Sequence, residues 1–201
     1  MPIRSHLPKL IIPVALIAMV LPARLSASDI ASFFGPNIAA GKKCTQSSVS
    51  AQWSQYQDKN KEAQGGVDGP KTGKFGFHTD NNDKDGAWWQ VDLGREVRLG
   101  AIMIYNRQDC CSDRADSLKV KVSSDGKNWT TQWDNQSKAA NDYYRGGGHT
   151  FGGIKGDNPL TIEVFGEYSA RYVRLQINPG NYLHLDKVEI CEYSDDMDNR
   201  Q

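Results

Sequence analysis

The sequence predicts an all-β fold, an antiparallel sandwich or barrel formed by a single domain. Seven runs of residues alternate apolar and polar side chains with a period of two, and a helical period is almost absent. Clusters of Gly, Asn and Asp separate these runs, and such clusters form the turns between short strands. The chain has 201 residues, a length typical of one domain with a substantial core.

The predicted strands follow one another along the chain, with one long connection over residues 134–159. In chain order they cover residues 87–94, 97–106, 118–124, 129–133, 160–166, 170–178 and 183–193. The Asp125-Gly126 pair between the third and fourth runs predicts a hairpin. The polar residues 195–201 have nothing to bury and predict a C-terminal tail.

The first 28 residues have the pattern of a secretory signal peptide. Two basic residues, Arg4 and Lys9, precede an apolar run over residues 10–21, and small residues at 26–28 resemble a cleavage site. The run is shorter than the roughly 20 residues that a spanning helix needs, although an uncleaved anchor is the alternative. We expect a secreted, extracellular protein, or a periplasmic one in a Gram-negative host, with residues 29–36 as a linker.

Charge and motifs exclude several functions. Removal of residues 1–28 takes away three basic residues and no acidic one, which leaves 21 basic and 24 acidic side chains and a net charge of −3. This balance argues against a nucleic-acid partner. The sequence has no Gly-x-Ser-x-Gly, Cys-x-x-Cys or His-Glu-x-x-His motif and no dinucleotide fingerprint. We therefore expect no enzymatic activity.

The most informative stretch is NRQDCCSDR, residues 106–114, which follows a predicted strand and therefore lies in a loop. The chain has four cysteines, and in an oxidising compartment four cysteines allow three pairings. Cys110 and Cys111 either bond to each other or each pair with Cys44 or Cys191. A bond between neighbours would close a tight, stiff ring, since adjacent α-carbons lie only about 3.8 Å apart.

Charged side chains flank this cysteine pair. Arg107 and Arg114 each present a planar fork of donors, and Asp109, together with Asp113, would offset their repulsion. An apolar plate beside rigid donors suits a neutral ligand with one apolar face and several hydroxyls, such as a sugar. The alternative is a pair of surface arginines beside cysteines that pair elsewhere.

The stretch resembles the signature of the F-type lectins (fucolectins), a branch of the discoidin, or coagulation factor type C, superfamily. In that signature Arg-x-Asp is usually followed by Cys-Cys and a second basic residue. Other parts of the chain are similar to the same family, namely residues 37–48, 65–69, 87–94, 123–129 and 170–190. The resemblance covers residues 37–194 and implies a discoidin-like antiparallel β-sandwich (jelly-roll) with binding loops at one end.

The resemblance also implies a ligand, L-fucose or a fucosylated glycan. By match to the family, His78, Arg107 and Arg114 would bind the sugar, which would rest on a vicinal Cys110–Cys111 disulfide. Loop position suggests an apolar pocket for the fucose methyl group formed by Trp53, Tyr56, Phe75 and Phe77. Trp88 and Trp89 are expected in the core, and His184, within a strand, is expected to be structural.

Two features depart from the family pattern. The gap between His78 and Arg107 is longer than usual, and the excess residues 79–87 are expected to bulge as a loop without displacing the histidine. Phe75 stands where the family has a smaller polar residue.

A structural calcium site is a further implication of the resemblance. Asp68 matches the family's ligand, and carbonyls near Gly65 and Pro70 would add oxygens. Lys187 stands where an acidic residue is expected, and Asp186 could compensate.

The resemblance finally implies a second disulfide, Cys44–Cys191, because the first and last strands are neighbours in discoidin-like sandwiches. On the loop-entropy model it would contribute ~4–5 kcal/mol. A homo-oligomer is possible. The competing function is a discoidin-type adhesion module that binds protein or phospholipid through apolar loop tips such as Trp53, Tyr56 and Phe75.

Overall fold

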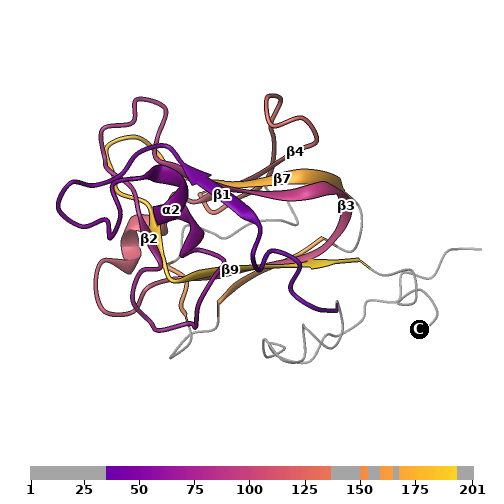
Figure 1. The fold of residues 1–201 in the computed structure, drawn as a ribbon, viewed down its shortest axis with the longest axis horizontal. Coiled ribbons are helices and arrows are strands. Elements are labelled where there is room, and N and C mark those ends of the chain that lie inside the picture. Colours follow the sequence, from indigo (N-terminus) through magenta and orange to yellow (C-terminus); the bar gives the residue numbers. More distant parts are fainter. Residues whose placement is uncertain (1–34, 137–149, 154–158, 165–167, 194–201) are drawn as a thin grey trace, which may run out of the picture.

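The computed structural model describes residues 35–136, 150–153, 159–164 and 168–193. Within these ranges the strands form two layers of antiparallel β-structure, which confirms the predicted all-β class (Figure 1). The predicted signal peptide, residues 29–34 of the linker and the C-terminal tail lie outside the described residues. In the described part of the chain, no helix has the length and apolar character needed to cross a membrane.

Nine strands and two short helical segments make up the described fold. The strands are β1 (Lys43–Gln46), β2 (Phe77–His78), β3 (Trp88–Tyr105), β4 (Lys119–Ser123), β5 (Thr130–Asp134), β6 (Leu160–Glu163), β7 (Ser169–Gln176), β8 (His184–Leu185) and β9 (Lys187–Glu192). The helical segments are α2 (Lys59–Gln64) and the 3₁₀ turn η1 (Ser112–Ala115). Sequence periodicity missed β1, α2, β2 and η1, which are too short to show a period.

Strand β3 is continuous where the sequence predicted two strands. Its first half pairs with β1 and β7, and its second half pairs with β6 and β9, so one strand takes part in both layers. The register shifts between Asp92 and Val97. Gly94, at φ +84°, donates its amide to Asp92 Oδ1 at 2.8 Å in this stretch. The glycine therefore marks a bulge within one strand and not the turn between two.

The core fills the space between the layers, where alternate side chains of β3, β7 and β9 meet. Trp89 is fully buried there and stacks on Phe77 with 5.5 Å between ring centroids. Phe77 is also fully buried, so its assignment to the ligand pocket was wrong. Trp88 was wrongly placed in the core: it is half-buried on the opposite face of β3, beneath the Arg174 guanidinium at 4.3 Å.

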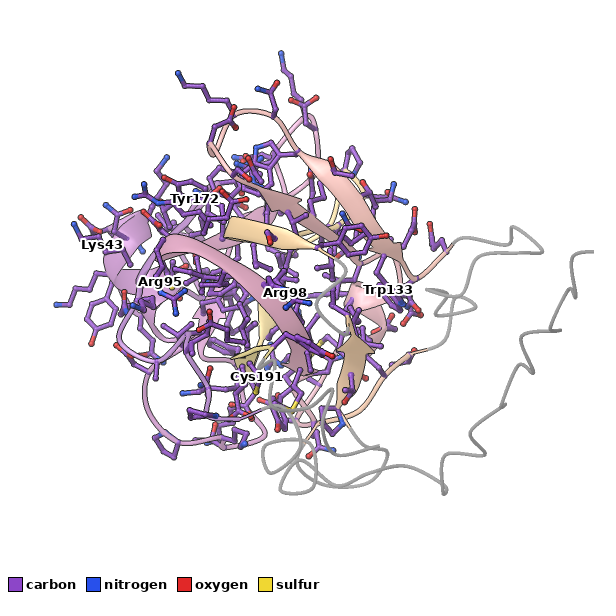
Figure 2. All side chains as sticks on the ribbon, turned by 90° about the vertical axis from the view of Figure 1, so that its right-hand side faces the viewer. Lys43, Arg95, Arg98, Trp133, Tyr172 and Cys191 are labelled. Atoms are coloured by element: carbon purple, nitrogen blue, oxygen red, sulfur yellow. A yellow bond between two sulfur atoms is a disulfide. The ribbon has the colours of Figure 1, made fainter. Side chains whose placement is uncertain are left out.

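The predicted Cys44–Cys191 disulfide is not formed. Both side chains are buried free thiols, and burial raises the pKa of each. Cys44 lies on β1, opposite Val91 in the first half of β3, whereas Cys191 lies on β9, opposite Ala101 in the second half. The first and last strands thus belong to different layers, which Figure 2 shows with Cys191 well away from Lys43 at the start of β1.

Candidate functional site

The loop that follows β3 contains the predicted vicinal disulfide. Cys110 and Cys111 are bonded, with 3.8 Å between their α-carbons, and Cys110 is exposed while Cys111 is partly exposed. Cys111 has a φ of +57°, the left-handed region that residues other than glycine rarely adopt. The buried Asn106 donates its amide to the carbonyls of Ser112 and Phe151, at 2.9 and 3.1 Å. These two hydrogen bonds fix the loop that carries the disulfide.

Arg107 lies beside the disulfide and is oriented by Asp109, as predicted. Its Nε and Nη2 donate to the two carboxylate oxygens at 2.6 and 2.8 Å, and the guanidinium stacks over Phe75 with 4.9 Å to the ring centroid. The hydrogen bonds hold the pKa of Asp109 below its usual range. Because the Arg107 guanidinium is held by a carboxylate and an aromatic ring, its remaining N–H donors keep a fixed direction.

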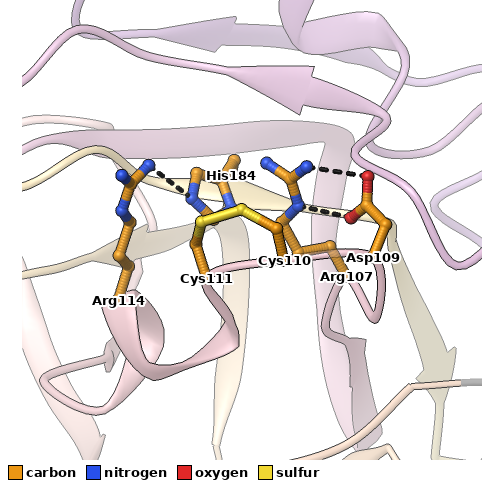
Figure 3. The surroundings of a disulfide bond; sticks show 6 residues. All are labelled: Arg107, Asp109, Cys110, Cys111, Arg114 and His184. Carbon is orange, nitrogen blue, oxygen red and sulfur yellow. Dashed lines mark hydrogen bonds and ion pairs between the residues drawn. A yellow bond between two sulfur atoms is a disulfide. The ribbon is translucent and has the colours of Figure 1, made fainter.

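Arg114 lies on the other side of the disulfide, within η1. Its Nη1 donates to Nε2 of His184 at 3.2 Å, and its guanidinium stacks over Tyr182 with 5.0 Å to the ring centroid. In Figure 3 the sulfur–sulfur bond lies between the two guanidiniums, with His184 behind it. The expected convergence of the two arginines on the cysteine pair is therefore present.

His78 lies next to this group, on β2. Its ring is 5.0 Å from His184, 5.4 Å from Tyr182 and 5.3 Å from Phe75 between centroids, and the residue is 2% exposed. Its Nδ1 is 2.7 Å from the carbonyl oxygen of Thr79. A carbonyl only accepts, so Nδ1 carries the proton and Nε2 is left as an acceptor.

The long segment 79–87 forms a loop, as expected. Asp83 in this loop accepts hydrogen bonds from the hydroxyls of Ser47 and Ser48 at 2.6 and 2.7 Å. The segment is thereby fastened to the residues after β1, and Thr79 at its start bonds to Leu183, beside the pairing of His78 with His184.

Both histidines are held neutral. Burial, with smaller effects of His78, Arg107 and Arg114, lowers the pKa of His184 to about 3. Burial also lowers the pKa of His78, against the effect of its bond to Thr79, and the two arginines add to the lowering. Neutral rings are needed here, since His184 accepts a hydrogen bond and a third positive charge would repel the arginines.

These shifts predict a fall in stability on mild acidification. When the pKa of a histidine is lowered in the folded state, the unfolded chain binds a proton below about pH 6.5 that the folded chain does not bind. The free energy of unfolding therefore falls below about pH 6.5, by up to about 1.4 kcal/mol per pH unit for each such histidine. For His184 the loss continues to about pH 3. The variant His184→Gln keeps an acceptor for Arg114 but removes this proton difference. Its free energy of unfolding should depend less steeply on pH between about pH 6.5 and 5, by up to the contribution of one proton, about 1.4 kcal/mol per pH unit. Denaturant unfolding at several pH values measures the slopes, and parallel curves for the two proteins would contradict the assignment.

A loop with exposed aromatic side chains adjoins His78. Trp53 is 52% and Tyr56 41% exposed, which sets them apart from the core aromatics. The hydroxyl of Ser54 donates to the carbonyl oxygen of His78 at 2.6 Å. The buried carboxylate of Glu62, on α2, accepts the amides of Tyr56 and His78 at 2.9 and 3.0 Å. The loop is thereby fixed to the strand that bears the histidine.

A polar pocket of about 260 Å³ adjoins Arg114. It is lined by carboxylates and amides, from Asp113, Asp116, Gln136, Asn178 and Asn181 together with Ser117 and Pro179. Asp113 therefore contributes to this pocket, whereas Asp109 holds Arg107.

The residues expected to bind calcium do not fit such a site as they lie. Both carboxylate oxygens of Asp186 accept the amide of Thr72, and one also accepts that of Gly73. Oδ1 of Asp68 accepts a backbone amide from Gly41 at 3.0 Å. The Lys187 ammonium donates to a carbonyl of the same loop. Among the described residues no cluster of three or more His, Cys, Asp or Glu side chains could hold a metal ion, and calcium needs six to eight oxygens.

The geometry can be compared with known proteins. The model of the F5/8 type C domain matches residues 43–188, most of the chain. The chain belongs to the F5/8 type C domain family. Fucolectin-6 of Anguilla japonica is 27% identical over 157 residues, covering 77% of this chain and 74% of that protein, and a fucolectin of Anguilla anguilla is 26% identical over 156 residues, 77% and 89% of the two chains.

Solved structures of two carbohydrate-binding proteins are also similar to this chain. The lectin domain of lectinolysin, solved with Lewis B antigen, is 27% identical, with a TM-score of 0.57 over 80% of this chain and 99% of that one. A fucose binding module of Streptococcus pneumoniae is 26% identical, with a TM-score of 0.55 over 78% and 94%. Together with the fucolectins, these relatives support the F-type lectin branch of the F5/8 type C family, as the sequence resemblance indicated.

Sequence reasoning missed three residues of the site. His184 was expected to be structural, yet it accepts the hydrogen bond of Arg114. Tyr182 stacks under the same guanidinium, and Glu62 fixes the backbone of His78. Asp58, an N-cap residue type whose carboxylate accepts the amides of Asn60 and Lys61, was the available signal for a helix start.

Proposed function

We propose that the protein is a secreted lectin without catalytic activity that binds L-fucose or fucosylated glycans. The observation that supports this most strongly is the arrangement of two fixed guanidiniums on either side of an exposed vicinal disulfide. The likeness to fucolectins and to a fucose binding module indicates the same ligand. The predicted signal peptide supports export.

The chemistry of the site suits a deoxyhexose. Arg107 and Arg114 donate hydrogen bonds to the hydroxyl and ring oxygens, and the neutral Nε2 of His78 accepts one from a hydroxyl when the side chains open toward the sugar. The apolar face of the sugar rests on Cys110 and Cys111, and its methyl group contacts Phe75. Because these donors are pre-oriented, little side-chain entropy is lost on binding.

The sugar site has few atoms to contact, so binding of one fucose is weak and adhesion requires several sites. Multivalency, through a homo-oligomer or a partner with several sites, raises the apparent affinity without new contacts. The polar pocket beside Arg114 offers room for the part of a glycan beyond its fucose.

The second candidate is an adhesion module that binds phospholipid through exposed aromatic side chains, which the exposure of Trp53 and Tyr56 favours. An array of fucosylated and non-fucosylated glycans, run beside phosphatidylserine vesicles, separates the two. We expect binding to fucosylated glycans that free L-fucose inhibits and galactose does not. Binding to vesicles with no fucosylated glycan retained would favour the second candidate and defeat the first.

A further inference from the structure

Lys187 has an unusual environment at the start of β9. The residue is 6% exposed, and its Nζ donates to the carbonyl oxygen of Gly69 at 2.6 Å. Gly69 belongs to a loop, residues 65–73, that packs against β9, and it has a positive φ of +74°. A long flexible side chain loses much entropy on burial, so the contact must return a comparable free energy.

The surroundings of the Lys187 ammonium are acidic. Burial lowers the pKa of Lys187, and the nearby Lys71 adds to the lowering, while the carboxylates of Glu189, Asp68 and Asp186 act against it and favour the charged form. Glu189 is itself paired with Lys71 at 2.8 Å and accepts the hydroxyl of Tyr105 at 2.9 Å. The ammonium therefore lies where the loop 65–73 and the closing strand bring together a carbonyl oxygen and several negative charges.

This loop continues into the proposed sugar site. The carbonyl of Gly73, at its end, accepts the amide of Gln108 in the disulfide loop at 2.8 Å. Two residues further on, Phe75 stacks against Arg107 and His78. Any group that holds residues 65–73 against β9 therefore also holds one wall of the sugar site.

We propose that the Lys187 ammonium is an internal cation that fixes the loop 65–73 and takes the place of a bound calcium ion. It supplies a positive charge and a hydrogen-bond donor to oxygens that a calcium ion would otherwise coordinate, and it is attached covalently to the chain. The fold, and the sugar binding that rests on the proposed function, are then independent of divalent cations.

Three variants test the role of Lys187. Lys187→Met keeps the apolar part of the side chain and removes the ammonium. Lys187→Glu replaces the ammonium by a carboxylate that could bind a calcium ion. Lys71→Met is the matched control, because Lys71 lies in the same loop but pairs with Glu189. Thermal unfolding and calcium titration calorimetry are measured on each full-length protein, with EDTA or with excess calcium chloride. Neither readout involves a sugar, so failure of the proposed function would leave this test intact.

We expect the wild type to unfold at the same temperature in EDTA and in calcium, with no heat of calcium binding. Lys187→Met should unfold roughly 5 °C lower in both conditions, and Lys71→Met should change less. Lys187→Glu should be destabilised in EDTA, because four carboxylates then face one another, and should bind calcium and regain the lost stability. The proposal is overturned if calcium binds and stabilises the wild type, if Lys187→Met is as stable as the wild type, or if Lys187→Glu neither loses stability nor responds to calcium.

Discussion

Arg107→Ala is expected to abolish measurable binding of L-fucose. The substitution removes a guanidinium whose two charge-assisted hydrogen bonds would each contribute about 1.5–3 kcal/mol, so affinity should fall by about 100-fold or more. It also leaves Asp109 without its partner, which places an uncompensated negative charge beside the sugar. Titration calorimetry of L-fucose against the wild type and the variant measures the loss.

A matched control comes from the opposite end of the sandwich. Arg171, on β7, makes the same two-pronged pair with Asp92, at 2.8 and 2.9 Å, but lies on the sheet formed by β3 and β7. Arg171→Ala should lose the equivalent pair and keep full affinity for L-fucose. Equal heats of binding in the wild type and in Arg107→Ala would contradict the proposed site.

Replacement of both neighbouring cysteines by alanine is expected to lower L-fucose affinity by about 10-fold or more, or about 1.4 kcal/mol. The bond holds Cys111 in the left-handed region. An alanine at this position is free to leave that region, which relieves about 1–2 kcal/mol of backbone strain. Once the ring is open, the loop relaxes, the flat apolar surface is lost and the spacing of the two arginines is no longer fixed. Fluorescence or calorimetric titration of the double variant measures the loss.

The buried thiols provide the control for this experiment. A variant with Cys44→Ala and Cys191→Ala retains the vicinal bond as its one remaining cysteine pair. It should bind L-fucose as the wild type does, and a reductant should then weaken binding to the level of the double variant at Cys110 and Cys111. The same affinity before and after reduction would show that the bond has no part in binding.

Local sequence patterns predicted the parts of the fold and site that local physics decides. Alternation identified the strands because the side-chain period of a strand is two residues. Asp109, two residues from Arg107, is close enough along the chain to orient it. The residues alone left the pairing of Cys110 and Cys111 open, and the family resemblance implied the bond that the structure contains.

The features that were missed depend on contacts between distant segments. His184 is 70 residues from Arg114, and the pairing of β2 with β8 brings the histidine there. The Cys44–Cys191 pairing was wrong because β3 spans both layers and separates β1 from β9. An unusual Lys187 was visible in the sequence, but the carbonyl that receives its ammonium was not.

A crystal structure of the protein with L-fucose tests the central claim most directly. We predict that the apolar face of the sugar lies within about 4 Å of the sulfur atoms of Cys110 and Cys111. We also predict hydrogen bonds of about 2.7–3.2 Å from both Arg107 and Arg114 to its oxygens. A sugar bound elsewhere, for example on Trp53 with neither guanidinium in contact, would contradict the account.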